Sequence, residues 1–220
     1  MDTDAAVIGR AGLEFFGRMC ASISHDIKNV LAVVNENAGL LEDLCAMADR
    51  GKPIDISRLK RLAADVKAQV RRGDGIASGM NRFAHSVDAS VVRLDLAEVM
   101  ELLKTLSLRF ASMKGAAFHL LPPQPAATVT TAPFLLLNLL WLCLEQATAA
   151  AGPARTVELT AEKEAGGASL RFRRLEELGS APAAAFPTET AGCLCRALNA
   201  ELRVDVQAKE ILVKILDLQA

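Results

Sequence analysis

The side chains best suited to chemistry stand together in residues 22–31, which read Ser-Ile-Ser-His-Asp-Ile-Lys-Asn-Val-Leu. A histidine occupies position 25, an acid follows at 26, and an amide stands at 29. Histidine is a nucleophile and a proton carrier near neutral pH. A neighbouring carboxylate can set its protonation, and an amide can position a second group. His25, Asp26 and Asn29 together predict nucleophilic or acid–base chemistry.

Apolar residues around this stretch recur every three or four positions, which predicts one long amphipathic helix. The stripe comprises Phe16, Cys20, Ile23, Ile27, Val30, Val34, Ala38, Leu41 and Cys45. Successive residues on a helix are about 100° apart, so His25 lies about 160° from both Ile23 and Ile27. We therefore expect its imidazole to point away from the stripe, towards water.

The predicted face around His25 carries small or polar side chains. Ser22, Lys28 and Asn29 lie within about 60° of it around the helix axis. Ala32 lies on the same face and is too small to cover the imidazole. We expect Ser22, Lys28 and Ala32 to contact any partner that docks over the histidine.

Composition limits the classes of function. The chain has 220 residues and a formal net charge of −1, which argues against a nucleic-acid binder, because such a protein needs a basic field. The first dozen residues have no apolar core typical of a signal peptide, and the longest apolar run, 133–144, is too short to span a bilayer. The five scattered cysteines are typical of reduced, core-filling thiols. These features predict a cytoplasmic protein with no membrane anchor.

The first half of the chain predicts a helical hairpin. One helix is expected over residues 11–47, and the Asp-Arg-Gly-Lys-Pro run at 49–53 is a turn by composition. A second helix should follow an N-cap at Asp55 or Ser57, with one apolar face and a basic surface. That surface is a solvated face or a site that steers an acidic partner; its residues are Arg58, Lys60, Arg61, Lys67, Arg71 and Arg72. Because one hairpin cannot bury so long a stripe, the sequence predicts a homodimer through a four-helix bundle.

The second half predicts a mixed α/β layer. Asp95 is expected to cap a helix that ends at Gly115. Strands are predicted over 117–121, 128–131, 156–163, 168–174, 202–207 and 211–216, with helices over 134–150 and 188–200. The fold class is therefore α+β: a long helical hairpin in residues 1–88, followed in residues 94–220 by a two-layer α/β sandwich.

The Ser-His-Asp-Ile-Lys-Asn-Val-Leu stretch resembles the H-box of two-component histidine kinases. In that family an acidic residue follows the phosphorylated histidine, and Asn or Thr stands four positions after it. His25, Asp26 and Asn29 match those three positions. Val30 departs from the pattern, because most members have proline there. The resemblance implies a dimeric phosphotransfer domain with His25 as the phosphorylated residue.

The element order after residue 94 resembles the ATP-binding domain of the same kinases. The helix over 134–150 corresponds to the one that holds the Mg²⁺-chelating Asn, but Gln146 occupies the position of that Asn. The adenine-binding Asp-x-Gly-x-Gly is replaced by Leu-Glu-Glu-Leu-Gly at 175–179, and Gly192 alone remains of the glycine-rich phosphate loop. Cradling a triphosphate needs several free amides. We therefore expect no nucleotide and no other cofactor on this chain.

An H-box without a nucleotide site resembles the histidine phosphotransferases of the ChpT type. The resemblance implies that His25 takes a phosphoryl group from the aspartate of one response regulator and passes it to another, with Mg²⁺ held by the regulator. The expected partners are response-regulator receiver domains and a second copy of the chain. On the helix wheel, Asp26 is expected to set the tautomer of His25, and Asn29 to act on the docked regulator.

Three alternatives stay open. A pseudo-kinase dimer could sequester a regulator or pair with a true kinase without using His25. A response-regulator phosphatase would use Asp26 and Asn29 but not a phosphorylated histidine. An active kinase with a divergent ATP site is the third.

Overall fold

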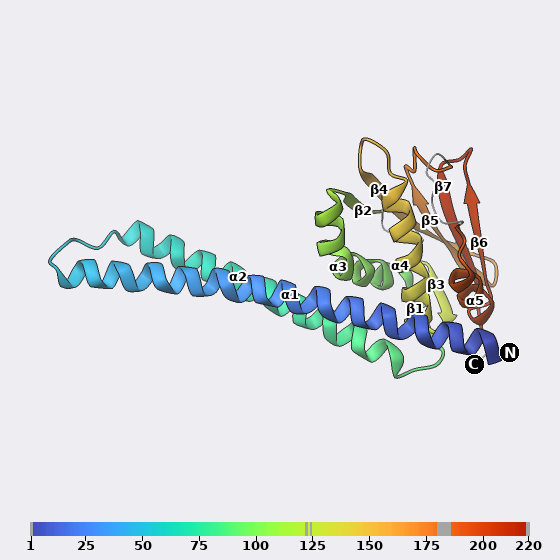
Figure 1. The fold of residues 1–220 in the computed structure, drawn as a ribbon, viewed down its shortest axis with the longest axis horizontal. Helices are drawn as coiled ribbons and strands as arrows, with labels where there is room; N and C mark the ends of the chain where they lie inside the picture. The colour runs from blue at the N-terminus through green and yellow to red at the C-terminus, as the bar shows by residue number, and fades with distance from the viewer. Residues whose placement is uncertain (1, 122, 124, 180–185, 219–220) are drawn as a thin grey trace. The chain divides into compact units, whose positions relative to one another are not determined.

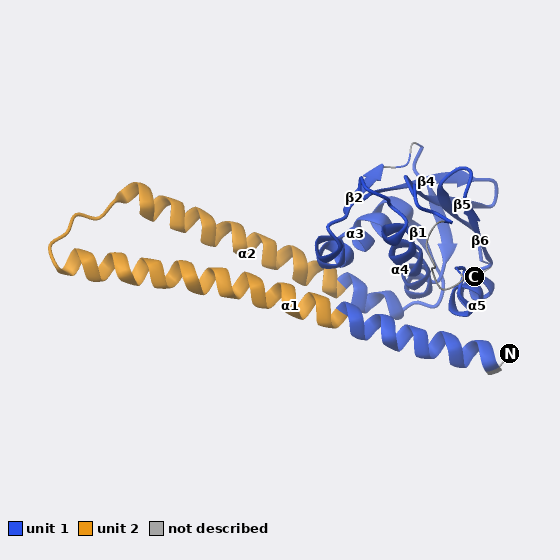
Figure 2. Cartoon of the chain, turned by 45° about the horizontal axis from the view of Figure 1, so that its top comes forward, with its two compact units in different colours: residues 1–19, 82–220 blue, residues 20–81 orange. Residues whose placement is uncertain are grey.

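The computed structural model describes residues 2–121, 123, 125–179 and 186–218. Contacts divide the chain into two compact units, drawn in different colours in Figure 2. One unit is Cys20–Asn81, and the other combines Met1–Met19 with Arg82–Ala220. The sequence-based division placed a linker between residues 88 and 94. Contacts instead group the first turns of the first helix with the α/β part.

Two helices form the Cys20–Asn81 unit. Helix α1 spans Asp2–Asp49 and α2 spans Ile56–Ala84, so each also extends into the other unit. The predicted cap of α2 is confirmed: a carboxylate oxygen of Asp55 accepts hydrogen bonds from the backbone N–H groups of Ser57, at 2.8 Å, and Arg58, at 3.3 Å. Gly51, in the connecting turn, has a φ of 76°, a left-handed conformation that glycine adopts without strain.

The helix pair is held by an inner stripe on α1: Ile23, Val30, Asn37 and Leu44, each seven positions after the last and each buried. The Asn37 amide donates to the carbonyl of Val33 at 2.8 Å, so this buried polar group is satisfied within its own helix. On α2, a Cβ at Gly73 would lie 3.4 Å from Cγ1 of Val30. The two helices therefore approach each other closely near Val30 and Gly73.

The apolar stripe predicted on α1 is only partly buried. Ile23 and Val30 are buried, but Leu41 is 45% exposed, and Ala38 and Cys45 are also exposed. This agrees with the expectation that one hairpin cannot bury the whole stripe. A helix with one partner covers only part of a broad apolar face, and the remainder stays open.

The α/β part begins with a 3₁₀ turn, η1 (His85–Val87), and alternates helices with short strands (Figure 1). The elements are β1 (Val92–Asp95), α3 (Leu96–Lys114), β2 (Ala117–Leu121), β3 (Thr128–Thr131), α4 (Pro133–Ala149), β4 (Thr156–Glu164), β5 (Gly167–Arg173), α5 (Glu189–Ala197), β6 (Ala200–Asp205) and β7 (Glu210–Leu216). The five-stranded sheet has the order β2-β4-β5-β7-β6, with β2 and β4 parallel and the other pairs antiparallel. Strands β1 and β3 form a separate antiparallel pair.

One face of this sheet packs against the helices, and the opposite face carries charge. Alternating residues of β4, β5 and β7 are fully buried towards the helices, including Leu159, Leu170 and Val213. On the opposite face, Arg171 of β5 pairs with Glu210 of β7 at 2.7 Å. Ion pairs of this kind keep an uncovered sheet face solvated.

The first turns of α1 are anchored within the α/β unit. The Asp4 carboxylate accepts two hydrogen bonds from the Arg196 guanidinium of α5, at 2.8 and 2.9 Å. Phe15 packs edge-on against Phe83, with ring centroids 5.4 Å apart, and its ring lies 6.1 Å from that of Trp141 on α4. These contacts explain why residues before Cys20 belong to this unit.

The α+β fold class is confirmed, with a long N-terminal helix followed by a sheet covered by helices. The predicted helix caps at Asp95 and Gly115 are present: Asp95 accepts from the Ala97 N–H at 2.8 Å, and Gly115 has a φ of 60°. Strand β1 was not predicted; the sequence analysis placed a linker up to Arg93. Among the described residues, no helix is long and apolar enough to cross a bilayer.

Gly167, at the start of β5, is the position where the sheet tolerates a side chain least. A Cβ there would collide with the backbone of Ile215 and Leu216 on β7. We expect Gly167→Ala to lower the free energy of unfolding by about 3 kcal/mol, at the upper end of overpacking costs. Gly9→Ala, on an exposed face of α1 with open space around it, is the matched control and should raise it by about 0.5–1 kcal/mol. Urea titration of both variants measures the difference; equal effects would contradict this packing.

Candidate functional site

His25 lies on the outer side of α1, as the helix wheel predicts. Its side chain is 49% exposed, whereas Ile23, two residues earlier, is 6% exposed and belongs to the inner stripe. Ile27, on the other side, is half-buried. The packing of α1 against α2 therefore turns the imidazole outward.

The side chain that contacts the imidazole is Asn29. Its amide nitrogen Nδ2 lies 3.1 Å from Nδ1 of His25, within hydrogen-bonding distance. The nearest Asp26 oxygen is 4.0 Å from the same nitrogen, too far for a direct hydrogen bond. Nε2 has no hydrogen-bond partner among the side chains that the structure describes. One ring nitrogen is therefore held from one turn along the helix, and the other is open.

Asp26 lies beside the histidine in a partly desolvated position. Burial raises the pKa of this carboxyl, and the positive charge of Arg72, on α2, acts in the opposite direction. The sequence analysis counted Arg72 only as part of a basic surface. The sequence gives no sign of this effect, because the two residues are far apart along the chain and come near each other only when the hairpin folds.

The three residues expected to contact a partner lie on α1 close to His25. Lys28 and Ala32 are exposed, and Ser22 is half-buried. The surroundings of His25 thus combine one cation and small side chains.

The segment 175–179, which replaces the adenine-binding motif in the sequence comparison above, is held by contacts within the chain. Leu175 and Leu178, in the segment that replaces the adenine-binding motif, are 0% and 6% exposed. The Leu175 N–H donates to the carbonyl of Lys209 at 3.1 Å, which fixes the segment to the β6–β7 turn. Residues 180–185, which follow, lie outside the described residues.

The start of α5 is capped by a threonine side chain. The side chain of Thr188 caps this helix and accepts from the Ala191 N–H at 3.2 Å, and the carbonyl of Thr188 accepts from the Gly192 N–H at 3.0 Å. Gln146, at the position of the metal-binding Asn, lies in the last turn of α4 and is half-buried.

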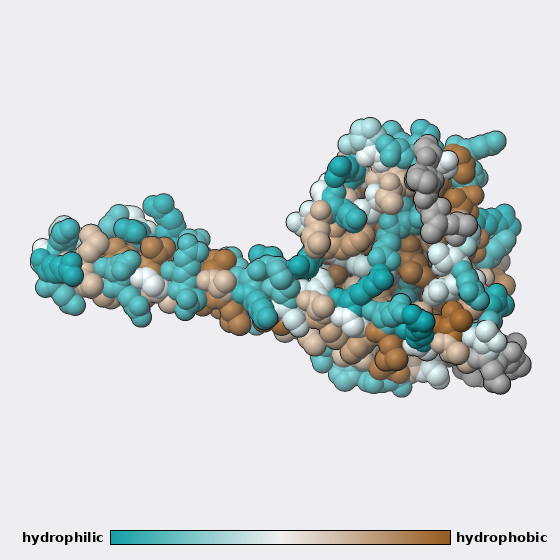
Figure 3. Space-filling view, in the orientation of Figure 1, coloured by the Kyte–Doolittle hydropathy of each residue, from teal (hydrophilic) through white to brown (hydrophobic). Residues whose placement is uncertain are grey.

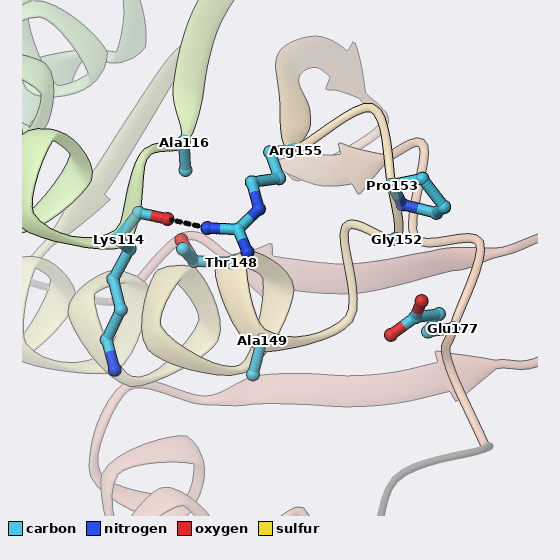
Figure 4. A pocket seen from close by; sticks show the side chains of 8 residues that line it. All are labelled: Lys114, Ala116, Thr148, Ala149, Gly152, Pro153, Arg155 and Glu177. Carbon is cyan, nitrogen blue, oxygen red and sulfur yellow. Dashed lines mark hydrogen bonds between the residues drawn. The ribbon is translucent and has the colours of Figure 1, made fainter.

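Figure 4 shows a hollow of about 290 Å³ at the carboxyl ends of α3 and α4. The Arg155 guanidinium donates to the carbonyl of Lys114 at 2.7 Å, which satisfies an open carbonyl at the end of α3. The Glu177 N–H donates to the carbonyl of Ala150 at 3.0 Å and fixes the turn after α4. These contacts satisfy backbone carbonyls at the ends of α3 and α4.

The cysteines behave largely as expected. All five are free, and Cys143, Cys193 and Cys195 are buried in α4 and α5. Burial raises the pKa of the Cys195 thiol to about 11, so it stays protonated at neutral pH. Cys45 is the exception to the core-filling prediction, because it is exposed on α1.

Comparison with known proteins finds similarity to solved structures. No protein-family model matches the chain, and neither does any curated protein sequence. The structure is similar to an Acinetobacter baumannii histidine kinase, AdeS, at 12% identity, with 87% of this chain and 97% of that chain covered and a TM-score of 0.47. It is also similar to a bacterial phosphotransferase at 17% identity, with 92% and 95% covered and a TM-score of 0.46. The ATP-binding domain of PrrB from Mycobacterium tuberculosis matches at 14% identity, with 60% and 100% covered and a TM-score of 0.44. Similarity at this level bears on neither activity nor partners, which must be inferred from the chain's own residues.

We predict that the protein does not bind Mg-ATP. By the resemblance drawn from the sequence, the segment 175–179 lacks the adenine-binding motif and Gln146 stands in place of the metal-binding Asn, and Leu175 and Leu178 are buried. Isothermal titration calorimetry should show no saturable binding tighter than about 1 mM, with an active histidine kinase catalytic domain as positive control. Low-micromolar binding would contradict this prediction and support the alternative of an active kinase.

Proposed function

We propose that this chain is a histidine phosphotransferase that relays a phosphoryl group between the aspartates of response regulators through His25. The supporting observation is the outward-facing imidazole, with Nδ1 contacted by Asn29 and Nε2 open. The absence of an adenine-binding motif at 175–179 favours transfer between proteins over transfer from ATP. A relay of this kind would operate in the cytoplasm, where response regulators act.

Transfer needs little from the chain beyond position and electrostatics. The Nε2 lone pair attacks the phosphorus of a regulator's aspartyl phosphate, and the bond between phosphorus and the aspartate oxygen breaks. The regulator recovers its carboxylate, and His25 becomes an Nε2-phosphohistidine. The reverse steps on a second regulator complete the relay. Because the transition state is loose, alignment of donor and acceptor supplies most of the acceleration. Mg²⁺ belongs to the acidic pocket of the regulator.

The surface around His25 fits the docking of a receiver domain. Ser22, Lys28 and Ala32 would contact the regulator close to its phosphoryl group, with Lys28 supplying positive charge. The basic residues of α2 would favour the approach of an acidic receiver surface. Asp26 and Asn29 complete the catalytic set with His25.

The proposed assembly is a homodimer. An outer stripe on α1 carries apolar residues that alternate steps of four and three: Ile27, Leu31, Val34, Ala38, Leu41 and Cys45. Leu31 is 60% and Leu41 45% exposed within one chain. Figure 3 shows apolar surface interspersed with polar surface along the hairpin. A second hairpin packed on this stripe would complete a four-helix bundle.

Charge on the outer stripe should prevent this assembly. We expect the wild type to be a dimer in light scattering at micromolar concentration, and Leu41→Glu to be largely a monomer, because the bundle would have to bury the new carboxylate. Ala46→Glu adds the same charge at an exposed position about 100° around the helix axis from the centre of the outer stripe and should leave the dimer intact. A monomeric wild type would contradict the proposed four-helix bundle.

His25→Gln separates transfer from the rival functions, because glutamine keeps a polar side chain but has no nucleophilic ring. In a mixture of one phosphorylated and one unphosphorylated regulator, wild-type protein should move label to the second regulator. His25→Gln should reduce that transfer to the level seen without protein. Regulator binding, measured by calorimetry, should change by less than about tenfold, or 1.4 kcal/mol. Undiminished transfer by the variant would exclude the relay, and retained dephosphorylation alone would favour a phosphatase.

A further inference from the structure

We propose that His85 is a second nucleophile of this chain, which takes a phosphoryl group from acyl phosphates while Asp88 holds its ring. His85 begins the 3₁₀ turn η1, directly after α2. The proposal does not use His25 and goes beyond the relay proposed for that residue. It is carried by a hydrogen bond to one nitrogen of the His85 ring and by a hollow that this ring borders.

A carboxylate fixes one side of the His85 ring. Nδ1 lies 2.6 Å from Oδ2 of Asp88, a distance typical of a charge-assisted hydrogen bond. The turn places the acid there, because the Asp88 backbone N–H donates to the carbonyl of His85 at 3.2 Å. The buried hydroxyl of Ser86 donates to the carbonyl of Phe83 at 2.6 Å and ties the turn to the end of α2.

This contact determines the reactive nitrogen. An ionised carboxylate has acceptor atoms only, so Nδ1 of His85 must carry the proton and the lone pair must lie on Nε2. Nε2 has no hydrogen-bond partner among the side chains that the structure describes. The His85 side chain is 65% exposed, so another molecule can reach this nitrogen. A nucleophile oriented by a carboxylate on its other nitrogen is a common catalytic arrangement.

A hollow of about 320 Å³ lies beside the ring, and His85, Arg82 and Arg93 are among the residues that line it. The Arg82 guanidinium donates to the carbonyl of Glu98 at 3.2 Å, and the Arg93 guanidinium donates to the hydroxyl of Thr128 at 3.2 Å. Each guanidinium has five N–H donors, so each keeps others for a ligand. Arginine binds phosphoryl oxygens particularly well, because its donors form a planar fork.

Two carboxylates also line the hollow, and both are already engaged. Glu98 lies 3.8 Å from Arg82, and Asp95 caps α3 by accepting from the Ala97 N–H at 2.8 Å. Arg93 forms no ion pair with any residue that the structure describes. The guanidinium of Arg93 is therefore the charge that remains to attract an anion into the hollow.

The remaining wall of the hollow is apolar and includes Val99, Leu102 and Leu137, which are largely buried. A ligand with one anionic end and one apolar end fits this combination better than free phosphate does. A short-chain acyl phosphate has both ends. Its leaving group is a carboxylate, which departs without a proton, so the site needs no general acid.

The reaction balances without a further reactant. The Nε2 lone pair of His85 attacks the phosphorus, the Nε2–P bond forms, and the bond between phosphorus and the acyl oxygen breaks. Its electron pair leaves with the carboxylate. The ring becomes positively charged and keeps its Nδ1 proton, and the hydrogen bond from Nδ1 to Asp88 offsets that charge. Asp88 is a positioning residue, whereas His85 is the nucleophile.

The test uses full-length His25→Gln protein, so that no label can arrive through His25. The protein is incubated with labelled acetyl phosphate, without ATP or regulators, and the label is mapped by peptide mass. His119, an exposed histidine on β2, is the control within the same chain. We expect label on His85 to form at least about tenfold faster than on His119, the equivalent of one charge-assisted hydrogen bond.

Variants separate the two features of the site. Asp88→Ala should slow labelling of His85 by about tenfold. At a pH of about 8.5, where a free imidazole is neutral, the same change should shift the NMR couplings of ¹⁵N-labelled His85 from Nδ1–H towards Nε2–H. Arg93→Gln should raise the half-saturating concentration of acetyl phosphate by about tenfold. Arg50→Gln, at an exposed position in the turn after α1, should change neither value.

A second incubation replaces acetyl phosphate with a receiver domain that carries an aspartyl phosphate, also an acyl phosphate. Label on His85 from this donor would support the proposal with a protein as the source. Labelling of His85 no faster than of His119 with both donors, as for adventitious modification of an exposed histidine, would overturn the proposal. A rate or tautomer unchanged in Asp88→Ala would also overturn it. Failure of wild-type His25 to accept label from a regulator would contradict the relay alone.

Discussion

The packing of α1 against α2 determines where every functional side chain of α1 points. Ile23, Val30, Asn37 and Leu44 are buried at regular intervals, so the rotational setting of the helix is fixed along its length. His25 then has to face outward. A polar residue within such an interface disfavours alternative registers, and Asn37 can take this role because its amide is satisfied within its own helix. A shift of one residue in this packing would redirect the imidazole.

The two parts of the chain contribute differently to the proposed chemistry. The histidine and its neighbours lie on a regular helix, which holds them more firmly than a loop would. In the α/β part, Leu175 and Leu178 of the 175–179 segment are buried. Helix α4 contributes many of its core residues, and α5 holds the first turns of α1 through the Arg196–Asp4 contact. The relay that we propose uses side chains of α1.

Local signals in the sequence predicted the hairpin, the caps at Asp55 and Asp95, and most strands, because caps and apolar periodicity act within a few residues. Long-range pairing could not be predicted in the same way: β1 exists because Leu94 pairs with Val129, far along the chain. Periodicity also located the apolar face of α1 but not the part of it that α2 covers. The contact between Asn29 and Nδ1 depends on side-chain rotamers, and a helix wheel gives only the direction of each Cα–Cβ bond.

The most direct test of the account is detection of the phosphorylated intermediate. Wild-type protein would be incubated with one response regulator carrying a labelled aspartyl phosphate, without an acceptor and without ATP, and the label mapped by its stability and by peptide mass. The account predicts acid-labile, alkali-stable phosphate on the peptide that contains His25, with the phosphorus on Nε2 by ³¹P NMR. Loss of label from the regulator only as inorganic phosphate, with no phosphohistidine at any time point, would contradict it.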